Sequence, residues 1–372
     1  MPLEGLMMNN ILMILKTQNL KNDQRVLKEI KSLTLNGANV EVFVAKNCDM
    51  TQEELHVPMC NVNIIGGAAP NNLIIRIIGV IHFYILNLVY LIPRKKNFEK
   101  VWICDPIMFG LVILLHLFSP KTKIIWDHHE LPPKWFLNNR ILMSLFKKAY
   151  LASDIVIHAN ESRRNYLEKS LGVQAKKIFI LSNYPLINMG DEEILNEKAE
   201  QWILENKFIY LQNSLQDNRY GANVIRAAIN AGYNIFHAGK VNQDYIEKNN
   251  LDKSKIFSAG YLNIKQINRV LNKCVFTVIL YKQDSLNQTY CDANRLYQAM
   301  ALGVPVVVGN NPTLIETTKS YKNCMVLDND GGDEQALYNT IVSFELNIKS
   351  REPMFFHWSD FDFIFQELVH DS

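Results

Sequence analysis

The sequence predicts an α/β protein made of two Rossmann-like, doubly wound domains that face each other across a cleft. Short apolar runs of strand length alternate with helical stretches along most of the chain. A polar, acidic stretch beginning at Met189 interrupts this alternation once, and it then restarts. The length of 372 residues also fits two domains of roughly 150 residues each. With 48% hydrophobic and 20% charged residues, the composition excludes a disordered or fibrous chain.

We place the first domain at residues 1–188. It opens with a buried strand at 11–15, a helix at 26–35 that stops at Gly37, and a strand at 40–45, which together form one βαβ unit. Further strands are predicted at 101–104, 123–126, 154–158 and 177–181, with helices at 108–118 and around 141–152. Strands that alternate with helices predict a parallel sheet covered on both faces.

A linker is predicted at 189–206, a second Rossmann-like domain at 207–350, and a C-terminal helix within 351–372. The strands of the second domain are expected at 208–212, 234–238, 255–258, 276–280 and 305–308, with helices at 222–231, 265–272 and 293–302. Apolar positions in 357–369 recur at helical spacing, so the chain end is expected to dock as a helix. Doubly wound sheets bind ligands at the carboxyl ends of their strands, so functional residues are sought there.

The charge balance is close to neutral. The chain has 39 Lys and Arg against 37 Asp and Glu, a net charge of +2, so nucleic acid is not expected as a partner.

The six cysteines, at positions 48, 60, 104, 274, 291 and 324, show no C-x-x-C spacing and lie mostly in apolar runs. This pattern predicts reduced, buried thiols in a cytosolic protein without a structural zinc site. No secretory signal is recognised at the start of the chain.

Residues 73–92 are apolar over a length that can span a bilayer. Arg76, His82 and Asn87 make a span costly, because a central Arg costs about 2.5 to 3.5 kcal/mol on insertion scales. The basic residues 94–96 follow directly and can meet anionic headgroups. We therefore favour a helix in the interface of the membrane's inner face, with a buried core helix as the alternative.

The strongest local motif is CDANRLYQAMALGVPVVVGNNP at 291–312, a polar loop followed by a helix, a glycine stop and a buried strand. It resembles the carboxy-terminal domain of GT-B glycosyltransferases, in particular the family-four type, in which P-N-K-L-x-E-x-M-A-x-G-x-P-V-V binds the nucleotide-sugar donor. The resemblance implies that Asn294, Arg295 and Gln298 bind the donor. A helix amino end and an Arg in the first turn both attract phosphate. The alternative is a helix–strand unit that only packs.

The motif departs from the family pattern at three positions. Ala293 stands where the family usually has Pro, and Gln298 stands where a Glu often bonds the ribose hydroxyls of the donor. Tyr290 replaces the first Glu of the paired-glutamate motif. Gln298 can still accept and donate hydrogen bonds, so we expect donor binding to be retained more fully than the electrostatic effect of the paired glutamates. Retention of the anomeric configuration, the family norm, is left open by these departures.

Residues 22–44 match another family pattern, D-x-R-V-x-x-E-x-x-x-L-x-x-x-G-x-x-V. The resemblance assigns Asp23 and Arg25 to the acceptor side of the site. Asp23 is also a good N-cap for the following helix, and Arg25 equally suits a salt bridge at the edge of the core.

The segment IIWDHHELPP, residues 124–133, runs a strand directly into two histidines and two carboxylates. Asp127, His129 and Glu130 match the D-x-H-E that these enzymes often carry, which implies that they are catalytic. His128, in the variable position, and Asp105, after the strand at 101–104, are placed on the acceptor side. A metal phosphoesterase of the DHH type and a cluster that merely caps the next helix are the alternatives.

Weaker signals in the second domain agree with the resemblance. Asn213 and Arg219 fall where these enzymes place a loop and an Arg near the diphosphate, and Gly239 and Lys240 fall at a glycine turn after a strand. All four are therefore predicted to bind the donor.

The resemblance implies a glycosyltransferase of the hexosyltransferase type that moves a sugar from a nucleotide-diphosphate sugar to an acceptor. The acceptor is expected to be a lipid-linked glycan of cell-surface polysaccharide synthesis, at the cytoplasmic face of the membrane. The nucleotide sugar is the substrate, and neither a cofactor nor a metal is expected, because Arg219, Arg295 and helix amino ends can offset the leaving diphosphate. The alternatives are a nucleotide-sugar epimerase or hydrolase on the same fold, and a non-catalytic, membrane-docked binding module.

Overall fold

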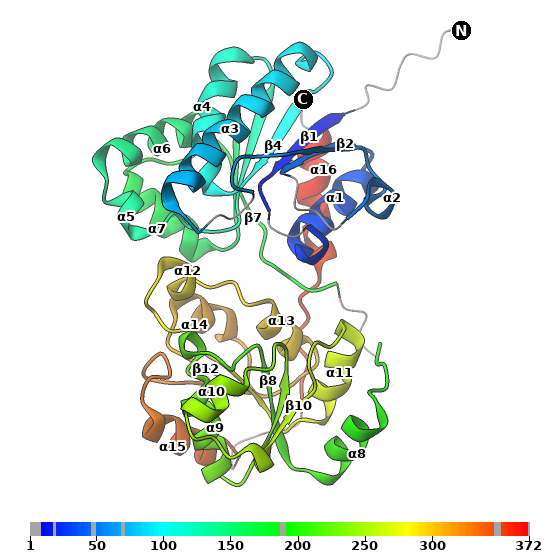
Figure 1. Ribbon diagram of the computed structural model, residues 1–372, viewed down its shortest axis with the longest axis vertical. Coiled ribbons are helices and arrows are strands. Elements are labelled where there is room, and N and C mark those ends of the chain that lie inside the picture. Colours follow the sequence, from blue (N-terminus) through cyan, green and yellow to red (C-terminus); the bar gives the residue numbers. More distant parts are fainter. Residues whose placement is uncertain are drawn as a thin grey trace. The chain divides into compact units, whose positions relative to one another are not determined.

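The computed structural model describes residues 9–17, 20–45, 50–67, 71–186, 191–345 and 351–370. The chain forms two compact units: unit 1 is residues 1–182 with 359–372, and unit 2 is residues 183–358. Each unit is a parallel sheet with helices on both faces (Figure 1). The predicted fold class, α/β with two Rossmann-like domains, is confirmed.

Unit 1 contains a parallel sheet with the strand order β3-β2-β1-β4-β5-β6-β7. The strands are β1 (Asn10–Leu15), β2 (Asn39–Ala45), β3 (Met59–Val62), β4 (Lys100–Cys104), β5 (Lys123–His128), β6 (Ile155–His158) and β7 (Ile178–Ile180). The chain moves outward from β1 to β3 and then continues with β4 on the other side of β1. The switch point, where doubly wound sheets bind ligands, therefore lies between β1 and β4.

The α-helices of unit 1 are α1 (Gln24–Leu35), α2 (Gln52–Leu55), α3 (Leu73–Leu91), α4 (Phe109–Phe118), α5 (Lys134–Leu137), α6 (Arg140–Ala152), α7 (Glu161–Leu171) and α16 (Asp362–His370). Side-chain caps start several of them. Asp23 accepts a hydrogen bond from Val26 N at α1, and Asn160 accepts one from Arg163 N at α7.

Unit 2 repeats the same order of strands, β10-β9-β8-β11-β12-β13, so its switch point lies between β8 and β11. Its strands are β8 (Phe208–Gln212), β9 (Asn234–Ala238), β10 (Ile256–Ser258), β11 (Thr277–Ile279), β12 (Val306–Val308) and β13 (Cys324–Val326). Its α-helices are α8 (Glu197–Glu205), α9 (Gly221–Asn230), α10 (Gln243–Lys248), α11 (Ile264–Lys273), α12 (Leu286–Thr289), α13 (Asn294–Ala301), α14 (Pro312–Thr318) and α15 (Glu334–Glu345).

The unit boundaries differ from the predicted ones. Residues 197–205 of the expected linker form α8, because Ala199 and Ile203 recur at helical spacing and are buried in the core of unit 2. Residues 187–190, where the linker was expected to begin, lie outside the described part of the chain. The C-terminal stretch is divided: residues 351–358 belong to unit 2, and α16 belongs to unit 1.

The docked C-terminal helix is held in unit 1 by apolar and polar contacts. The rings of Phe365 and Trp102 stack with their centroids 6.4 Å apart. Lys100 Nζ donates a hydrogen bond to the carbonyl oxygen of Val369 at 2.6 Å. The expected terminal helix is therefore present, and it completes the core beneath β4.

Cysteine usage agrees with reduced thiols where the structure describes it. The five described cysteines form no disulfide, and Cys104, Cys274 and Cys291 are buried. Cys48 lies outside the described residues.

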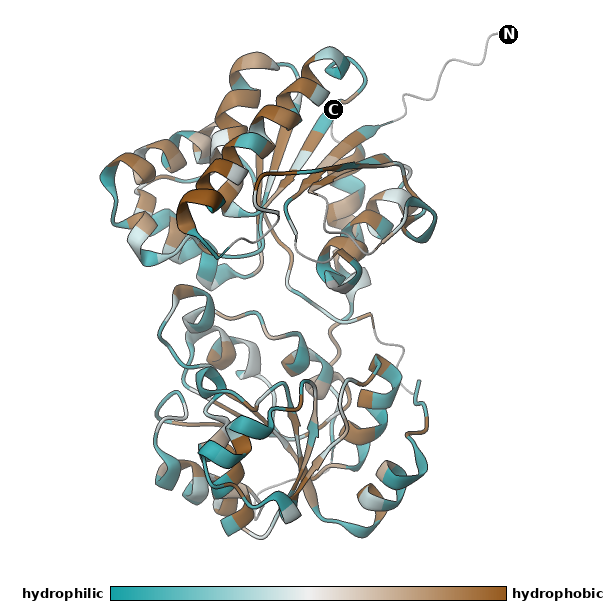
Figure 2. Cartoon of the chain, viewed as in Figure 1, coloured by the Kyte–Doolittle hydropathy of each residue, from teal (hydrophilic) through white to brown (hydrophobic). Residues whose placement is uncertain are grey.

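Helix α3 has one buried and one exposed apolar face. Val80, Phe83 and Leu91 are buried, and Phe83 packs on Phe43 with ring centroids 5.7 Å apart. The exposed face is a stripe of aliphatic side chains, each at least 44% exposed: Ile74, Ile78, Ile81, Ile85 and Val89. Figure 2 shows the helix as apolar along most of its length. The segment Leu73–Arg94 is 22 residues long and apolar enough to cross a membrane by length and composition, and only 22% of its apolar window is buried. It is therefore not a fully buried core helix.

Candidate functional site

The carboxyl end of β5 in unit 1 carries a buried network of charged side chains, which we call the Arg25 network: Arg25, Glu29, Asp127 and His129. Asp127 lies near the end of β5 and His129 directly follows the strand, whereas Arg25 and Glu29 lie four residues apart on one face of α1. Glu29 and Asp127 are fully buried, and Arg25 is 7% exposed. Such burial requires each charge to have a partner.

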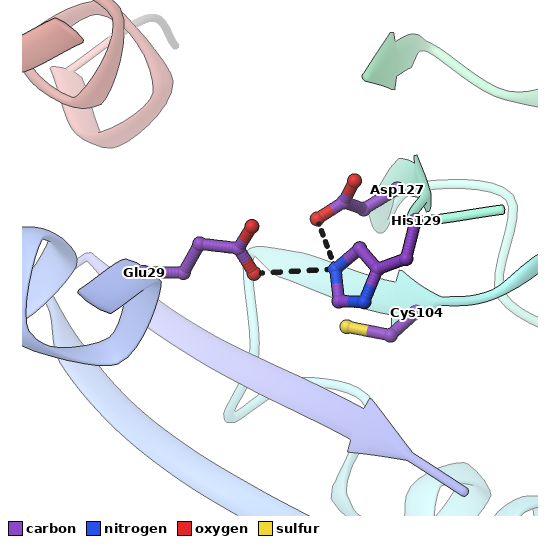
Figure 3. Close-up of side chains that lie close together, drawn as sticks. All are labelled: Glu29, Cys104, Asp127 and His129. Atoms are coloured by element: carbon purple, nitrogen blue, oxygen red, sulfur yellow. Dashed lines mark hydrogen bonds and ion pairs between the residues drawn. The ribbon is translucent and has the colours of Figure 1, made fainter. Parts of the chain in front are cut away.

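Arg25 is the centre of the network. Its Nε lies 2.9 Å from Glu29 Oε1, and its Nη2 lies 3.1 Å from Asp127 Oδ1. Its Nη1 donates a hydrogen bond to the carbonyl oxygen of Leu181 at 2.6 Å. His129 Nε2 lies 2.9 Å from Asp127 Oδ2 and 3.6 Å from Glu29 Oε2 (Figure 3). The network therefore ties α1 to the ends of β5 and β7.

The charges of the network balance one another. Burial alone would lower the pKa of His129, but the carboxylates of Asp127 and Glu29 outweigh it and raise that pKa well above its usual range. Burial acts to raise the pKa of Asp127, and Arg25 and His129 reverse this and lower it. Burial raises the pKa of Glu29 to about 7, so this carboxyl is fully ionised only above neutral pH. In that range, with Arg25 and His129 protonated, two positive and two negative charges sum to zero.

This arrangement limits what His129 can do. Its Nε2 is directed at two carboxylates, and Cys104 lies beside the ring (Figure 3). The Arg163 guanidinium donates to the backbone carbonyl of His129, which fixes the chain after β5. An imidazole protonated and held in this way suits the stabilisation of negative charge better than the abstraction of a proton.

Residue types that bind metals are also present here. Glu29, Cys104, Asp127 and His129 offer ligand atoms that all lie within 4.8 Å of one another. Arg25 already contacts both carboxylates, however, so a divalent cation would have to displace its guanidinium. The ion pairs within the protein therefore account for the geometry of these four side chains.

Asp105 follows β4 beside this network and has an unusual backbone, with φ 76° and ψ 141°. Residues other than glycine rarely adopt a positive φ of this kind. Its main chain is fixed on both sides: its N–H donates to Asp127 O at 2.8 Å, and its carbonyl accepts from Trp126 Nε1 at 3.1 Å. Burial raises the pKa of its carboxyl to about 6, with His129 opposing the shift and nearby carboxylates adding to it.

The remaining acceptor-side predictions have mixed outcomes. Asp23 caps α1, which is the structural role that the sequence also allowed. Glu130 is exposed directly after the network. Placing His128 on the acceptor side is wrong, because successive side chains of a strand point to opposite faces and Asp127 faces the network. His128 is 1% exposed, and its ring lies 4.2 Å from that of Trp126 and 5.0 Å from that of His158.

In unit 2, two arginines meet at one aromatic ring, a group we call the arginine pair: Arg219, Arg295 and Tyr281. The Cζ atoms of Arg219 and Arg295 lie 3.6 and 5.0 Å from the centroid of the Tyr281 ring. Arg295, in the first turn of α13, donates from Nη1 to Gln212 O at 2.7 Å and from Nη2 to Leu280 O at 3.4 Å. These carbonyls end β8 and follow β11, so the pair lies at the switch point of unit 2.

The arginine pair has no counter-charge, since neither guanidinium forms an ion pair with any residue in the described part of the chain. Nε and Nη1 of Arg219 are buried and make no hydrogen bond there. Burial and the neighbouring Arg295 lower the pKa of Arg219 to about 10. An anion that contacts both guanidinium groups would relieve this repulsion and satisfy the unpaired N–H groups.

Glycines bring the loops of this edge close together. A Cβ atom on Gly221, the first residue of α9, would lie 1.9 Å from Ser214 O. Gly239, after β9, has φ 124°, and a Cβ atom there would lie 2.0 Å from Asn213 Oδ1. Asn213 and Lys240 are exposed at the same edge. Five of the seven predicted donor-binding residues, at positions 213, 219, 239, 240 and 295, therefore share the carboxyl edge of one sheet.

Gln298 differs from its predicted role. Its side chain is 4% exposed, and its Nε2 donates to Asn268 Oδ1 of α11 at 2.9 Å. The amide is thus satisfied inside unit 2 by a side chain of α11. Asn294, the first residue of α13, is partly exposed, and the N-cap residue Ala293 provides no side-chain cap.

Three residues of these sites were not among the predicted site residues: Glu29, Cys104 and Tyr281. The i, i+4 spacing of Arg25 and Glu29 on a helix was a signal for an ion pair between them. No comparable signal existed for Cys104 or Tyr281, because only the order of the strands brings them beside His129 and the two arginines.

No protein-family model matches the chain, and no curated protein matches it significantly. Solved structures match it over nearly their whole length. They include sucrose-phosphate synthase from Thermosynechococcus elongatus (TM-score 0.69, 13% identity, covering 98% of both chains) and HepE of Anabaena in complex with UDP (TM-score 0.68, 12% identity, covering 98% of this chain and 95% of that chain). WaaG, a glycosyltransferase involved in lipopolysaccharide biosynthesis, matches with a TM-score of 0.64 and 12% identity over 97% of this chain and 94% of that chain. The fold is GT-B, as the sequence predicted; at these identities the likeness establishes the fold alone.

Proposed function

We propose that the protein is a glycosyltransferase that moves a sugar from a nucleotide-diphosphate sugar to an acceptor hydroxyl. The observation that carries this proposal is the arginine pair of unit 2. Two guanidinium groups with no carboxylate partner lie at the switch point of a Rossmann-like sheet, beside the amino end of α13. A diphosphate carries the charge and the acceptor oxygens that this pair lacks.

The same pair supports a transfer that needs no metal. When the bond between the sugar and the phosphate breaks, negative charge develops on the leaving diphosphate. Arg219 and Arg295 are already in place to stabilise it, at no cost of reorganisation. The UDP bound to HepE and the glycosyltransferase activity named for WaaG fit a nucleotide sugar as donor, and we extend this to a hexose as the transferred group.

The acceptor is proposed to be a lipid-linked glycan of cell-surface polysaccharide synthesis, reached from the cytoplasmic face of the membrane. The exposed aliphatic stripe of α3 supports this part of the proposal. Residues 94–96, Arg-Lys-Lys, follow the helix and are exposed, so an apolar face and a basic patch occur together.

A screen of donor binding tests the nucleotide site. UDP and UDP-glucose should raise the unfolding temperature of the protein, because a ligand that binds the folded state stabilises it by RT ln(1 + [L]/Kd). Arg219→Met should weaken binding about 10- to 150-fold, the equivalent of a charged hydrogen bond of about 1.5 to 3 kcal/mol. Arg226→Met is the matched control, because Arg226 also lies in unit 2 but pairs with Glu334 at 2.8 Å. Equal losses in both variants would contradict the assignment.

Dependence on an acceptor separates transfer from the alternatives. A transferase releases UDP from UDP-glucose faster when alkyl glycosides are added as hydroxyl acceptors. A hydrolase releases it without them, and an epimerase changes the sugar without releasing nucleotide. A non-catalytic binding module does none of these.

Vesicle co-sedimentation tests the membrane. Protein should bind vesicles of anionic lipid at low salt and leave them at high salt, because basic residues near the surface contribute roughly 1 kcal/mol each. Changing Arg94, Lys95 and Lys96 to Gln should release it. Changing Lys248, Lys253 and Lys255 of unit 2 removes the same charge elsewhere and should not. Wild-type protein that stays in the supernatant at low salt would refute the membrane part of the proposal and leave the donor site unaffected.

A further inference from the structure

Arg219 is central to the proposed donor site, but its own side chain is weakly anchored. Nε and Nη1 of its guanidinium are buried and make no hydrogen bond within the described part of the chain. The guanidinium lies over the Tyr281 ring, with Cζ 3.6 Å from the ring centroid, and it shares this ring with a second cation, Arg295. The position of Arg219 therefore depends on the two loops that carry it and Tyr281.

The loop that carries Arg219 has a strained backbone. Arg219 ends a 3₁₀ turn at Asp217–Arg219, and Tyr220 after it has φ 51°, a left-handed conformation that residues with a Cβ rarely adopt. Such a conformation persists only where the surroundings fix it. Here the Tyr220 hydroxyl donates a hydrogen bond to Asp330 Oδ2 at 2.8 Å. This bond ties the strained turn to the loop that follows β13.

The same carboxylate oxygen holds the loop that carries Tyr281. Gln283 N, two residues after the ring, donates to Asp330 Oδ2 at 3.1 Å. The two loops also bond directly, since Lys282 N donates to Asn218 O at 3.1 Å. One oxygen of Asp330 therefore joins the two loops on which the arginine pair depends.

A glycine lets the loop of Asp330 approach both of these loops. Gly331 has φ 108°, and a Cβ atom there would lie 2.4 Å from Leu280 Cδ1 and 3.2 Å from Tyr220 Cδ2. A larger residue would therefore be both strained and in collision at this position. Gly331 N donates to Asn329 Oδ1 at 2.8 Å, which closes the turn around Asp330.

We propose that Asp330 is a positioning residue of the donor site: it holds the loops of Arg219 and Tyr281 so that both arginines are in place before the nucleotide binds. This inference rests on the proposed function. An arginine that is already in place costs less ordering when the diphosphate binds. Burial and the Asp330 carboxylate raise the pKa of Tyr220, so its hydroxyl stays protonated at neutral pH and remains a donor to Asp330.

The test compares the affinity of Asp330→Ala and wild-type protein for UDP by calorimetry. The variant lacks the oxygen that joins the two loops, so its Kd for UDP should rise about 3- to 10-fold, the order expected when a side chain must be immobilised on binding. Asp333→Ala is the matched control from the same loop, because Asp333 Oδ1 caps α15 by accepting from Ala336 N at 3.0 Å. The control should lower the unfolding temperature through loss of this cap and leave the Kd unchanged.

A double-mutant cycle shows whether Asp330 acts through Arg219. In protein that already carries Arg219→Met, Asp330→Ala has no arginine to misplace at that position, and Arg295 keeps its hydrogen bonds to Gln212 O and Leu280 O. The second substitution should then change the Kd by less than about 2-fold.

Three results would overturn this inference alone: an unchanged Kd in Asp330→Ala, an equal rise in Asp333→Ala, or losses that add fully in the cycle. Failure of the proposed function shows differently, as a wild-type protein that does not bind UDP, and it would refute this inference as well.

Discussion

The Arg25 network and the arginine pair occupy equivalent edges of two sheets that share one order of strands, yet they treat positive charge in opposite ways. In unit 1, Arg25 lies within 3.1 Å of a carboxylate on two sides, and the charges cancel. In unit 2, Arg219 and Arg295 share the Tyr281 ring with no carboxylate nearby, and buried N–H groups of Arg219 have no acceptor. A balanced network can hold its elements together without a ligand, and we propose that the unbalanced pair binds an anion. On this proposal, charge balance distinguishes a structural cluster from a binding site where burial and position in the fold do not.

The largest change in the free energy of unfolding is expected when Arg25, the arginine at the centre of the balanced network, is removed. Arg25→Met leaves Glu29 and Asp127 buried with only His129 as a cation, so we expect a loss of about 3 to 5 kcal/mol in the free energy of unfolding. Urea unfolding followed by the fluorescence of Trp102 and Trp126 in unit 1 measures it. Arg25→Lys keeps the charge but not the two directed hydrogen bonds of Arg25 to Leu181 O and Asp127 Oδ1, and should recover part of the loss. A loss below about 1 kcal/mol in Arg25→Met would mean that the network contributes little to folding.

Buried histidines extend the comparison to pH. Burial lowers the pKa of His158 in unit 1 to about 3 and that of His237 in unit 2 to about 4. Because these values lie below the 6.5 of the unfolded chain, the unfolded state takes up protons first as the pH falls. Stability is then present above pH 6.5 and is lost towards pH 4, by about 3 kcal/mol for each histidine at 1.36 kcal/mol per unit of pH.

Unfolding between pH 7 and 4.5, measured for His158→Asn and His237→Phe, checks this expectation. Each variant should flatten the pH dependence of its own unit and leave that of the other unchanged. His128, buried in the same aromatic cluster as His158, also has a lowered pKa, so unit 1 should keep part of its slope in His158→Asn. Variants with the wild-type slope would show that these histidines do not set the acid stability.

The sequence was informative where one residue and its neighbours along the chain decide the outcome. The buried strands were predicted because apolar runs bounded by polar loops have few other ways to fold. The position of Arg295 in the first turn of a helix was predicted because a polar loop precedes it, while its donor-binding role came from the family resemblance and stays a prediction. The polar helix α7 was missed, since ESRRNYLEKSL has little apolar periodicity. Alternation along β5 puts His129 on the same face as Asp127 and His128 on the opposite face, and only the packing of the sheet decides which of these faces carries the charged network. Gln298 and Arg295 share α13, and only the packing of α11 makes one structural and leaves the other at the open edge.

The smallest expected effect is a gain in stability, opposite in sign to the loss expected for Arg25→Met. It concerns the arginine pair of unit 2. Arg219→Met removes one of two repelling cations together with buried N–H groups that have no acceptor, and a methionine can still cover the Tyr281 ring. The ligand-free protein should therefore become more stable by about 1 kcal/mol, while its affinity for UDP falls. Urea unfolding of unit 2, with and without UDP, measures both effects, and wild-type protein should gain stability from UDP that the variant does not. A ligand-free variant that is less stable than the wild type by 1 kcal/mol or more would mean that Arg219 has a structural role like that of Arg25, and the distinction drawn from charge balance would fail at this position.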